Sequence, residues 1–191
     1  MKKSILMFLF ALLFFSSAVD ATPIEWSTES GGNGNYYQFV DHGEYLSWQT
    51  AKALAENMTF QGFSGHLATV TSNIENTFVS SSSVWSDTSV SVWLGAEYHG
   101  EWTWVTGEEW NYTNWNAGSP NNLSSPGGDY LLYFERHSRG KWGDAYTSYF
   151  EMTGFIVEYG IASAPVPEPG TMILFGMGCL GFARVLRKKR H

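Results

Sequence analysis

Two adjacent acids, Glu108 and Glu109, are the residues whose type and spacing come nearest to a catalytic pair. A glycosidase needs two carboxyl groups that lie on either side of one glycosidic bond. Neighbouring residues of an extended chain point to opposite faces, so these two acids do not face a common substrate. We therefore interpret them as part of a solvated turn.

The other groups that commonly do catalysis are scattered along the chain. The histidines His42, His66, His99 and His137 have no metal-ligand spacing such as His-x-x-x-His. No serine lies in a Gly-x-Ser-x-Gly turn, and the single cysteine, Cys179, lies in a C-terminal apolar run. The sequence predicts that the protein is not an enzyme. An enzyme that acts on extracellular polymers is the less favoured alternative, which turnover of a polysaccharide panel would reveal.

Two amphipathic helices are predicted in the body of the chain. Apolar positions three and four residues apart predict two buried stripes, one of Trp48, Ala51, Leu54, Ala55 and Met58 and one of Ile74, Phe78 and Val79. Ser47 is placed to cap the first helix, and Ser72 with Glu75 forms a capping box at the start of the second.

Strands are predicted on both sides of these helices. Five runs rich in β-branched and aromatic residues predict them, at Tyr36–Val40, Val90–Leu94, Trp102–Val105, Tyr130–Phe134 and Gly154–Tyr159. The glycine-rich stretch 31–35 and the serine run 80–83 are interpreted as loops. One strand, two helices and then further strands indicate a single α+β domain over residues 22–164.

The charge of this body argues against a nucleic-acid partner. The whole chain has a formal net charge of −7, but seven of its 11 basic residues lie near the two ends. Residues 22–164 contain sixteen acidic and four basic side chains, a formal charge of −12. Such a surface repels a phosphate backbone.

The N-terminus has the three regions of a secretory signal peptide. Lys2 and Lys3 precede the apolar run Ile5–Phe15, and the small-residue stretch 16–21 follows it. The run of 11 apolar residues is too short to cross a bilayer core of about 30 Å. We predict cleavage after Ala21, with Ala18 as the alternative, and export of the body.

The C-terminus combines a proline-rich stop, an apolar run and a basic cluster. Pro167, Glu168 and Pro169 precede the run Thr171–Ala183, and four basic residues lie at positions 187–190. This tail resembles the PEP-CTERM sorting signal of Gram-negative bacteria, here assigned to residues 165–191. The resemblance implies an inner-membrane-anchored precursor with the basic end in the cytoplasm. It also implies an exosortase that removes the tail and leaves the domain on the cell surface or outside the cell.

The body resembles the C-type lectin-like domain. Seven segments carry this resemblance in order, namely Gly65–Ser72, Glu75–Asn76, Trp93–Gly95, Trp102–Gly107, Tyr112–Asn122, Gly140–Asp144 and Gly154–Tyr159. It implies a double-loop fold whose two ends pair as antiparallel strands, with a long loop that carries the ligand site. Tyr130 stands where this family usually has a disulfide cysteine, so packing must replace crosslinks. We expect Trp93, Trp102, Trp104, Trp115 and Trp142 to form the core.

The resemblance also implies where calcium and a sugar would bind. Pro120 and Asn121 match the family's calcium loop, but Ser119, Gly128 and Gly143 replace three of its ligands. Asn121 and Asp144 remain, and Asp129 is near enough in sequence to add a carboxylate. Calcium takes six to eight oxygens, so this set predicts a degenerate site. Asn and Asp also bond their own backbone in loops, and this turn chemistry is the competing role for both residues.

The resemblance gives a leading function and a rival. The leading hypothesis is an exported binding module that recognises an extracellular glycan or matrix protein through Asn121, Asn122, Trp142 and Asp144. The rival is a structural or adhesion protein of the matrix with neither a calcium nor a sugar site. The cis peptide that the family needs before Pro120 is the geometric feature that we expect the loop to retain.

Overall fold

The computed structural model describes residues 21–86, 89–121, 129–134, 138–146 and 152–160. The helices and strands are β1 (Ile24–Glu25), a 3-10 turn (Thr28–Ser30), β2 (Tyr36–Asp41), α1 (Trp48–Glu56), β3 (Thr59–Phe60), β4 (Phe63–Leu67), α2 (Asn73–Val79), β5 (Ser91–Tyr98), β6 (Trp102–Trp104), β7 (Asp129–Phe134), β8 (Lys141–Tyr146) and β9 (Met152–Tyr159). The predicted signal peptide and sorting tail lie outside the described residues.

Strand β9 organises the sheet, whose order is β1-β2-β9-β5-β7-β8. Its residues 154–159 pair antiparallel with β2 on one edge, with Phe39 opposite Ile156. On the other edge, its first half pairs parallel with β5 and its second half antiparallel with β4. The two ends of the domain therefore pair as antiparallel strands, as predicted. Among the described strands, β5 and β9 form a parallel pair, and the other pairs are antiparallel.

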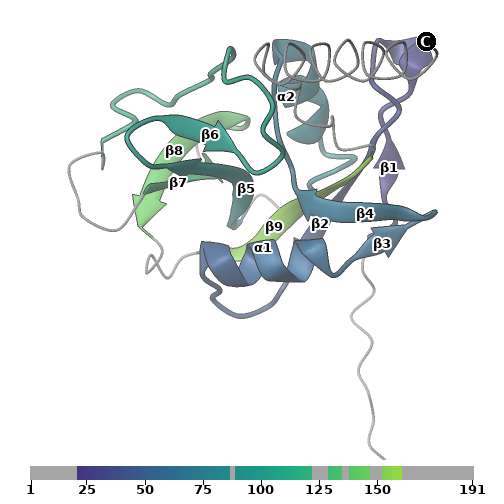
Figure 1. Cartoon of the computed structure of the whole chain (residues 1–191), viewed down its shortest axis with the longest axis horizontal. Helices are drawn as coiled ribbons and strands as arrows, with labels where there is room; N and C mark the ends of the chain where they lie inside the picture. The colour runs from purple at the N-terminus through teal and green to yellow at the C-terminus, as the bar shows by residue number, and fades with distance from the viewer. Residues whose placement is uncertain (1–20, 87–88, 122–128, 135–137, 147–151, 161–191) are drawn as a thin grey trace, which may run out of the picture.

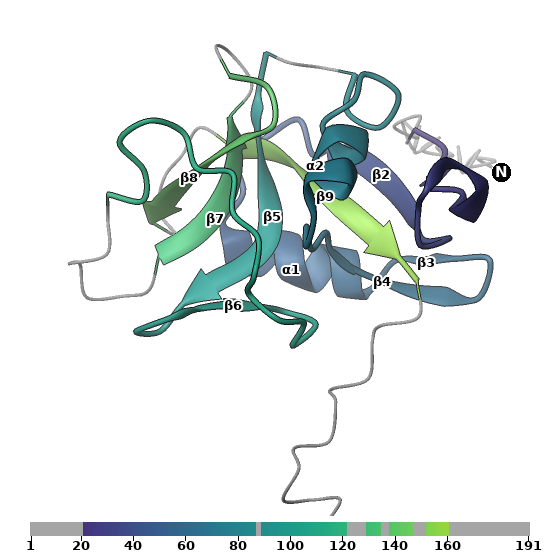
Figure 2. The same ribbon diagram turned by 90° about the horizontal axis from the view of Figure 1, so that it is seen from above.

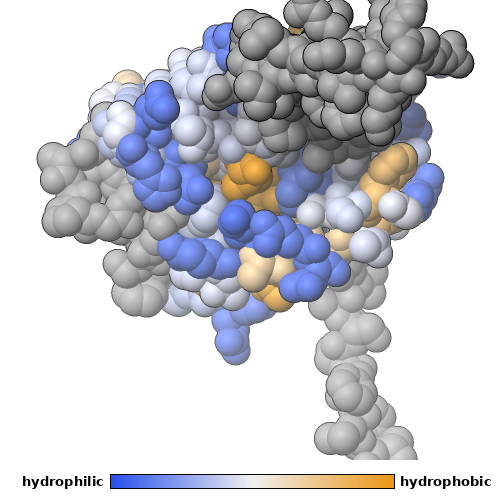
Figure 3. Space-filling model, in the orientation of Figure 1, coloured by the Kyte–Doolittle hydropathy of each residue, from blue (hydrophilic) through white to orange (hydrophobic). Residues whose placement is uncertain are grey.

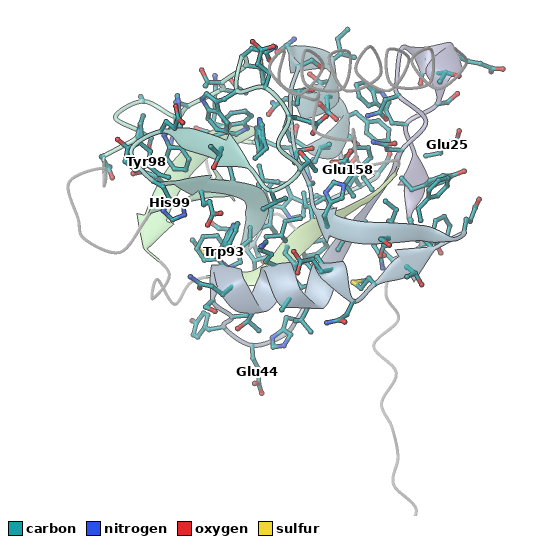
Figure 4. All side chains as sticks on the ribbon, in the orientation of Figure 1. Glu25, Glu44, Trp93, Tyr98, His99 and Glu158 are labelled. Atoms are coloured by element: carbon teal, nitrogen blue, oxygen red, sulfur yellow. The ribbon has the colours of Figure 1, made fainter. Side chains whose placement is uncertain are left out.

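The two helices lie on opposite sides of β2 and β9, with α1 below and α2 above in Figure 1, and the view from above in Figure 2 agrees. Helix α1 starts where Ser47 Oγ accepts the backbone N–H of Thr50 at 3.2 Å. Two indole N–H groups join α1 and the loop before it to β5. Trp48 Nε1 of α1 donates to the Leu94 carbonyl at 2.7 Å, and Trp93 Nε1 of β5 donates to the Leu46 carbonyl at 3.0 Å. Trp93 is seen beside α1 in Figure 4.

The predicted helix faces are partly wrong. Leu54 is 37% exposed, whereas Ala51 and Ala55 are fully buried. These two alanines bring α1 close to the sheet, and residue 54 turns away because it lies about 100° round the helix from residue 55. Ile74 is 60% exposed, and α2 instead buries Glu75, Asn76 and Val79. Polar contacts made by Glu75 and Asn76 determine which face of α2 is inside.

The tryptophans form the core as predicted. Trp104 and Trp142 are buried in one core cluster and Trp93 in the other. Trp102, Trp110 and Trp115 are half-buried and pack against the first cluster. Every buried member of the two described core clusters lies between Trp26 and Tyr159. The core of the described residues is therefore rich in packed aromatic rings.

The surface that faces the viewer in Figure 3 is mainly hydrophilic, with small separate hydrophobic patches. The large hydrophobic side chains that are exposed among the described residues are Tyr45, Leu54 and Ile74. Within the same residues, no helix has the length and apolar character needed to cross a membrane.

Candidate functional site

The loop predicted to carry the ligand site meets β8 at Asp144. The peptide bond between Ser119 and Pro120 is cis, as the sequence led us to expect. The next residue, Asn121, donates its backbone N–H to Asp144 Oδ1 at 2.8 Å. Asp144 is only 6% exposed, while Asn121 is exposed. A buried carboxylate therefore fixes the backbone of an exposed loop residue.

Trp142 of β8 positions the same loop through backbone hydrogen bonds. Its backbone N–H donates to the Asn114 carbonyl at 2.9 Å, and its carbonyl accepts the N–H of Asn116 at 2.7 Å. Its indole is fully buried, and Nε1 donates to Asn76 Oδ1 of α2 at 2.8 Å. In the described structure the Trp142 ring contributes to the core, and its backbone positions the loop.

The described oxygen donors near Asp144 are too few for a calcium shell. Asp129 begins β7, and its backbone lies opposite Tyr146 of β8, but its side chain is outside the described part of the structure. Asn122 is also outside it. Among the described residues, no group of three or more His, Cys, Asp or Glu side chains is arranged to hold a metal ion. Asn121 and Asp144 alone fall well short of six oxygens.

A second polar site, which we did not predict, lies under α2. A cavity of about 490 Å³ lies between the glycine-rich stretch 31–35, the start of α2 and the ends of β4 and β9. Three carboxylates, Glu75, Glu108 and Glu158, line it together with His66. Figure 4 shows Glu158 in the interior, between α2 and β4.

Glu158 is the best satisfied of these carboxylates. It is 3% exposed, and its Oε1 accepts the Asn35 amide at 2.7 Å and lies 3.0 Å from the Tyr37 hydroxyl. Its Oε2 accepts both the backbone N–H and the hydroxyl of Thr69 at 3.0 Å. His66 Nδ1 lies 4.0 Å from Oε2. These contacts tie β9 to β2 and to the chain that follows β4.

Glu75 is equally buried but has fewer donors. Its Oε2 accepts the backbone N–H and the hydroxyl of Thr71, at 2.7 and 3.0 Å, and its Oε1 lies 2.6 Å from the Tyr37 hydroxyl. Burial, and then the charge of Glu158, raises the pKa of Glu75 above its ordinary value. Burial and the two carboxylates also raise the pKa of Tyr37, so its hydroxyl stays protonated.

The prediction of a solvated turn is wrong for Glu108. Its Oε2 lies 2.6 Å from the Thr69 hydroxyl and accepts the Thr106 hydroxyl at 2.9 Å. Glu109 is exposed, as predicted. The sequence holds one signal for this site, because Glu158 is a lone charge within the apolar strand Met152–Tyr159. A charge in such a strand needs buried partners.

Comparison with known families assigns the fold. Residues 44–150, more than half of the chain, match the family model described as the Lectin C-type domain. The chain belongs to the C-type lectin domain family. Residues 165–189 match the PEP-CTERM protein-sorting motif. This motif indicates export and a surface or extracellular location in bacteria.

Related proteins share this domain in different settings. Halomucin of Haloquadratum walsbyi is 35% identical over 144 residues, which are 67% of this chain and 1% of halomucin. Rat lithostathine is 35% identical over 91 residues, which are 46% of this chain and 51% of lithostathine. The chain therefore spans about half or less of the length of these curated relatives.

A solved structure of similar fold is the carbohydrate-recognition domain of the mouse scavenger receptor C-type lectin. It is 28% identical, with a TM-score of 0.51, and the match covers 66% of this chain and 88% of that one. The lectin domain thus forms nearly the whole of that solved chain.

Proposed function

We propose that the protein is an exported, non-enzymatic module that binds an extracellular glycan through the loop 118–129 and the adjacent strand β8. The contact between the Asn121 backbone and Asp144 Oδ1 is the observation that carries this proposal. It joins the cis-proline loop to β8 at the place where the family resemblance puts the ligand site. Membership in the C-type lectin domain family supports a carbohydrate as the ligand.

Within this proposal the site residues have different roles. Asn121, Asn122 and Asp129 present polar groups to the ligand, and Asp144 fixes the backbone of Asn121. Trp142 is a positioning residue, because its fully buried ring is out of a ligand's reach. No carboxyl pair is assigned to bond cleavage, so bound glycan should remain intact.

Calcium is not required for this proposal. The described ligand candidates, Asn121 and Asp144, do not complete the coordination shell of calcium. A complete shell would need oxygens from Asn122 and Asp129 as well. If these residues complete the site, we expect weak binding, with a dissociation constant near the millimolar values of extracellular calcium modules.

The test is binding of the soluble domain, residues 22–164, to a panel of immobilised bacterial and plant polysaccharides, in calcium and in excess chelator. Asp144→Asn removes the charge that holds Asn121, and we expect at least a tenfold loss of affinity. Glu44→Gln is the matched control, because Glu44 is exposed and lies beside α1 on another part of the surface (Figure 4). We expect the control to bind normally.

Each other outcome has a definite meaning. Equal binding by the wild type and Asp144→Asn would place the glycan site elsewhere. No binding to any polysaccharide would favour the structural or adhesion role. Release of new reducing ends during incubation would contradict the non-enzymatic assignment.

The same variants test calcium through thermal unfolding. An ion with a dissociation constant of about 1 mM stabilises the folded state by about 1.4 kcal/mol at about 10 mM calcium, a shift of a few degrees. This shift should vanish in Asp144→Asn. No shift in the wild type would mean that glycan binding does not use calcium.

We further propose the maturation steps that fit the two ends of the chain. The signal peptide 1–21 directs export, and the tail 165–191 anchors a precursor in the inner membrane of a Gram-negative bacterium until an exosortase removes it. N-terminal sequencing and the intact mass of the exported product would test both cleavages. A product that retains residues 165–191 would contradict the second.

A further inference from the structure

A line of five side chains connects three carboxyl groups through two hydroxyl groups under α2. We call it the carboxylate network, and its members in order are Glu75, Tyr37, Glu158, Thr69 and Glu108. The four successive oxygen–oxygen distances along it are 2.6, 3.0, 3.0 and 2.6 Å. The members come from α2, β2, β9 and two loops, so the network joins segments that are far apart in the sequence.

The network has too few protons if every carboxyl group is ionised. Each of the four contacts needs one proton between its two oxygens, and a hydroxyl group supplies only one. The hydroxyl groups of Tyr37 and Thr69 therefore satisfy two contacts. In the other two contacts, the lone pairs of a hydroxyl oxygen and a carboxylate oxygen would face each other at hydrogen-bond distance. A protonated carboxyl group would remove such a conflict.

No lysine or arginine offsets these charges among the described residues that line the cavity. The titratable groups that face Glu75 are Tyr37 of β2, Glu158 of β9 and, farther along the network, Glu108, while His66 of β4 lies beside Glu158. An unpaired buried charge is costly, and a buried carboxyl group without a cation tends to bind a proton.

Glu75 is the member best placed to hold the extra proton. Four hydrogen-bond contacts surround the carboxylate of Glu158 and stabilise its charge, whereas Glu75 has three, one from Tyr37 and two from Thr71. The 2.6 Å contact lies within the range of O–H···O hydrogen bonds. Glu75 then donates to Tyr37, and Tyr37 donates to Glu158.

We propose that the folded domain holds a proton on Glu75, and that release of this proton weakens the attachment of α2 to β2 and β9. The domain thereby senses pH through its stability. This property does not depend on the proposed glycan site, because the residues of the network are separate from Asn121 and Asp144.

The direction of the effect follows from the raised pKa of Glu75. The folded state holds the proton at pH values at which the unfolded chain has already lost it. Stability from this group is complete below the ordinary glutamate pKa of about 4.3, and is lost as pH rises through the folded value. Within that window, each pH unit lowers the folding equilibrium constant about tenfold for one proton.

The test is urea unfolding of residues 22–164 in excess chelator, at a series of pH values between about pH 4 and pH 9. Tryptophan fluorescence monitors the unfolding. Glu75→Gln keeps the shape of a neutral carboxyl group and can still donate to Tyr37. We expect the free energy of unfolding of this variant to change less with pH than that of the wild type, by the contribution of one titrating group. Glu44→Gln, which removes an exposed acid, should follow the wild type.

Infrared spectroscopy gives a direct second measurement. As pH rises above the ordinary glutamate pKa of about 4.3, the carbonyl stretch of a neutral carboxyl group should persist to a higher pH in the wild type than in Glu75→Gln. If that variant does not fold, the infrared spectrum of the wild type alone decides the proposal. A neutral carboxyl band that disappears from the wild type at the ordinary glutamate pKa of about 4.3, or parallel pH profiles for the wild type and Glu75→Gln, would overturn it.

Discussion

Asn76 connects helix α2 to the strand that carries Asp144. Its Oδ1 accepts the indole N–H of Trp142 at 2.8 Å, and its Nδ2 donates to the Gly140 carbonyl at 3.1 Å. Asn76 is 4% exposed and Trp142 is fully buried, so water has little access to either group. One amide side chain thus fixes the start of β8 and the aromatic ring beneath the loop.

We predict that Asn76→Ala destabilises the domain by about 1–3 kcal/mol, because a buried donor that loses its acceptor keeps its full desolvation penalty. Urea unfolding at pH 7 would measure this change. Thr77→Ala is the neighbouring control. Its exposed hydroxyl donates within the helix to the Asn73 carbonyl, and its removal should change stability by about 0.5 kcal/mol or less. Equal effects of the two substitutions would contradict the assigned role of Asn76.

Some contacts of the Asp144 site and of the carboxylate network could be predicted from the sequence, and others could not. The capping box at Ser72 and Glu75 was predicted from local spacing, and Ser72 Oγ does accept the Glu75 N–H at 3.2 Å. One partner of the Glu75 carboxylate, Thr71, is four positions away, but the other, Tyr37, is 38 positions away. Local patterns do not identify such a partner, because the fold alone decides which distant strand lies under the helix. The cis bond before Pro120 was predicted because the family resemblance supplied the long-range information.

Strands β4 and β5 approach so closely beside α1 that one position requires glycine. Gly95 of β5 donates its N–H to the Ala68 carbonyl at 2.8 Å and accepts the Val105 N–H at 2.8 Å. A Cβ atom on residue 95 would overlap the Leu67 carbonyl oxygen and would lie 2.9 Å from Val105 Cγ2. The first of these neighbours is backbone, which cannot move without disturbing β4.

We predict that Gly95→Ala lowers the free energy of unfolding by about 3 kcal/mol, at the upper end of the usual overpacking range. Gly107→Ala is the control, since Gly107 has a φ of 76° and open space around its Cα. There the loss should be about 1 kcal/mol, from the backbone conformation alone. Chemical denaturation of both variants would compare the two values. A smaller loss for Gly95→Ala than for Gly107→Ala would contradict the close approach.

At the level of elements, periodicity predicted both helices but not the exact face of either. The strands β2, β5, β6, β7 and β9 lie close to the predicted runs. Strand β4 was missed, because its sequence Phe-Ser-Gly-His-Leu contains a glycine, which is depleted in strands, and no β-branched residue. Its pairing with β9 determines its conformation, and Gly65 is needed there because a Cβ atom would lie 2.6 Å from the Ala55 carbonyl oxygen.

The domain as a whole carries a strong negative charge. Sixteen acidic and four basic residues lie between positions 22 and 164. Like charges distributed over one small body repel each other and favour the expanded, unfolded state. Dissolved salt screens this repulsion over distances beyond about 10 Å at about 0.1 M.

We therefore predict that the melting temperature of residues 22–164 rises by a few degrees between about 10 and 300 mM NaCl. Differential scanning fluorimetry would measure it. The double variant Glu44→Gln/Glu101→Gln removes two exposed charges and should reduce the slope. A melting temperature that falls with added salt would show instead that attractive ion pairs dominate.

The central position of β9 has a consequence for the time at which the domain can fold. This strand contacts β2, β4 and β5, yet it is the last of the domain to be synthesised. A chain on the ribosome or in a secretion channel that has not yet released residue 159 lacks the strand that joins its two halves. The sheet therefore closes only once this last strand is free to pair, so folding of the whole domain waits for its C-terminal part.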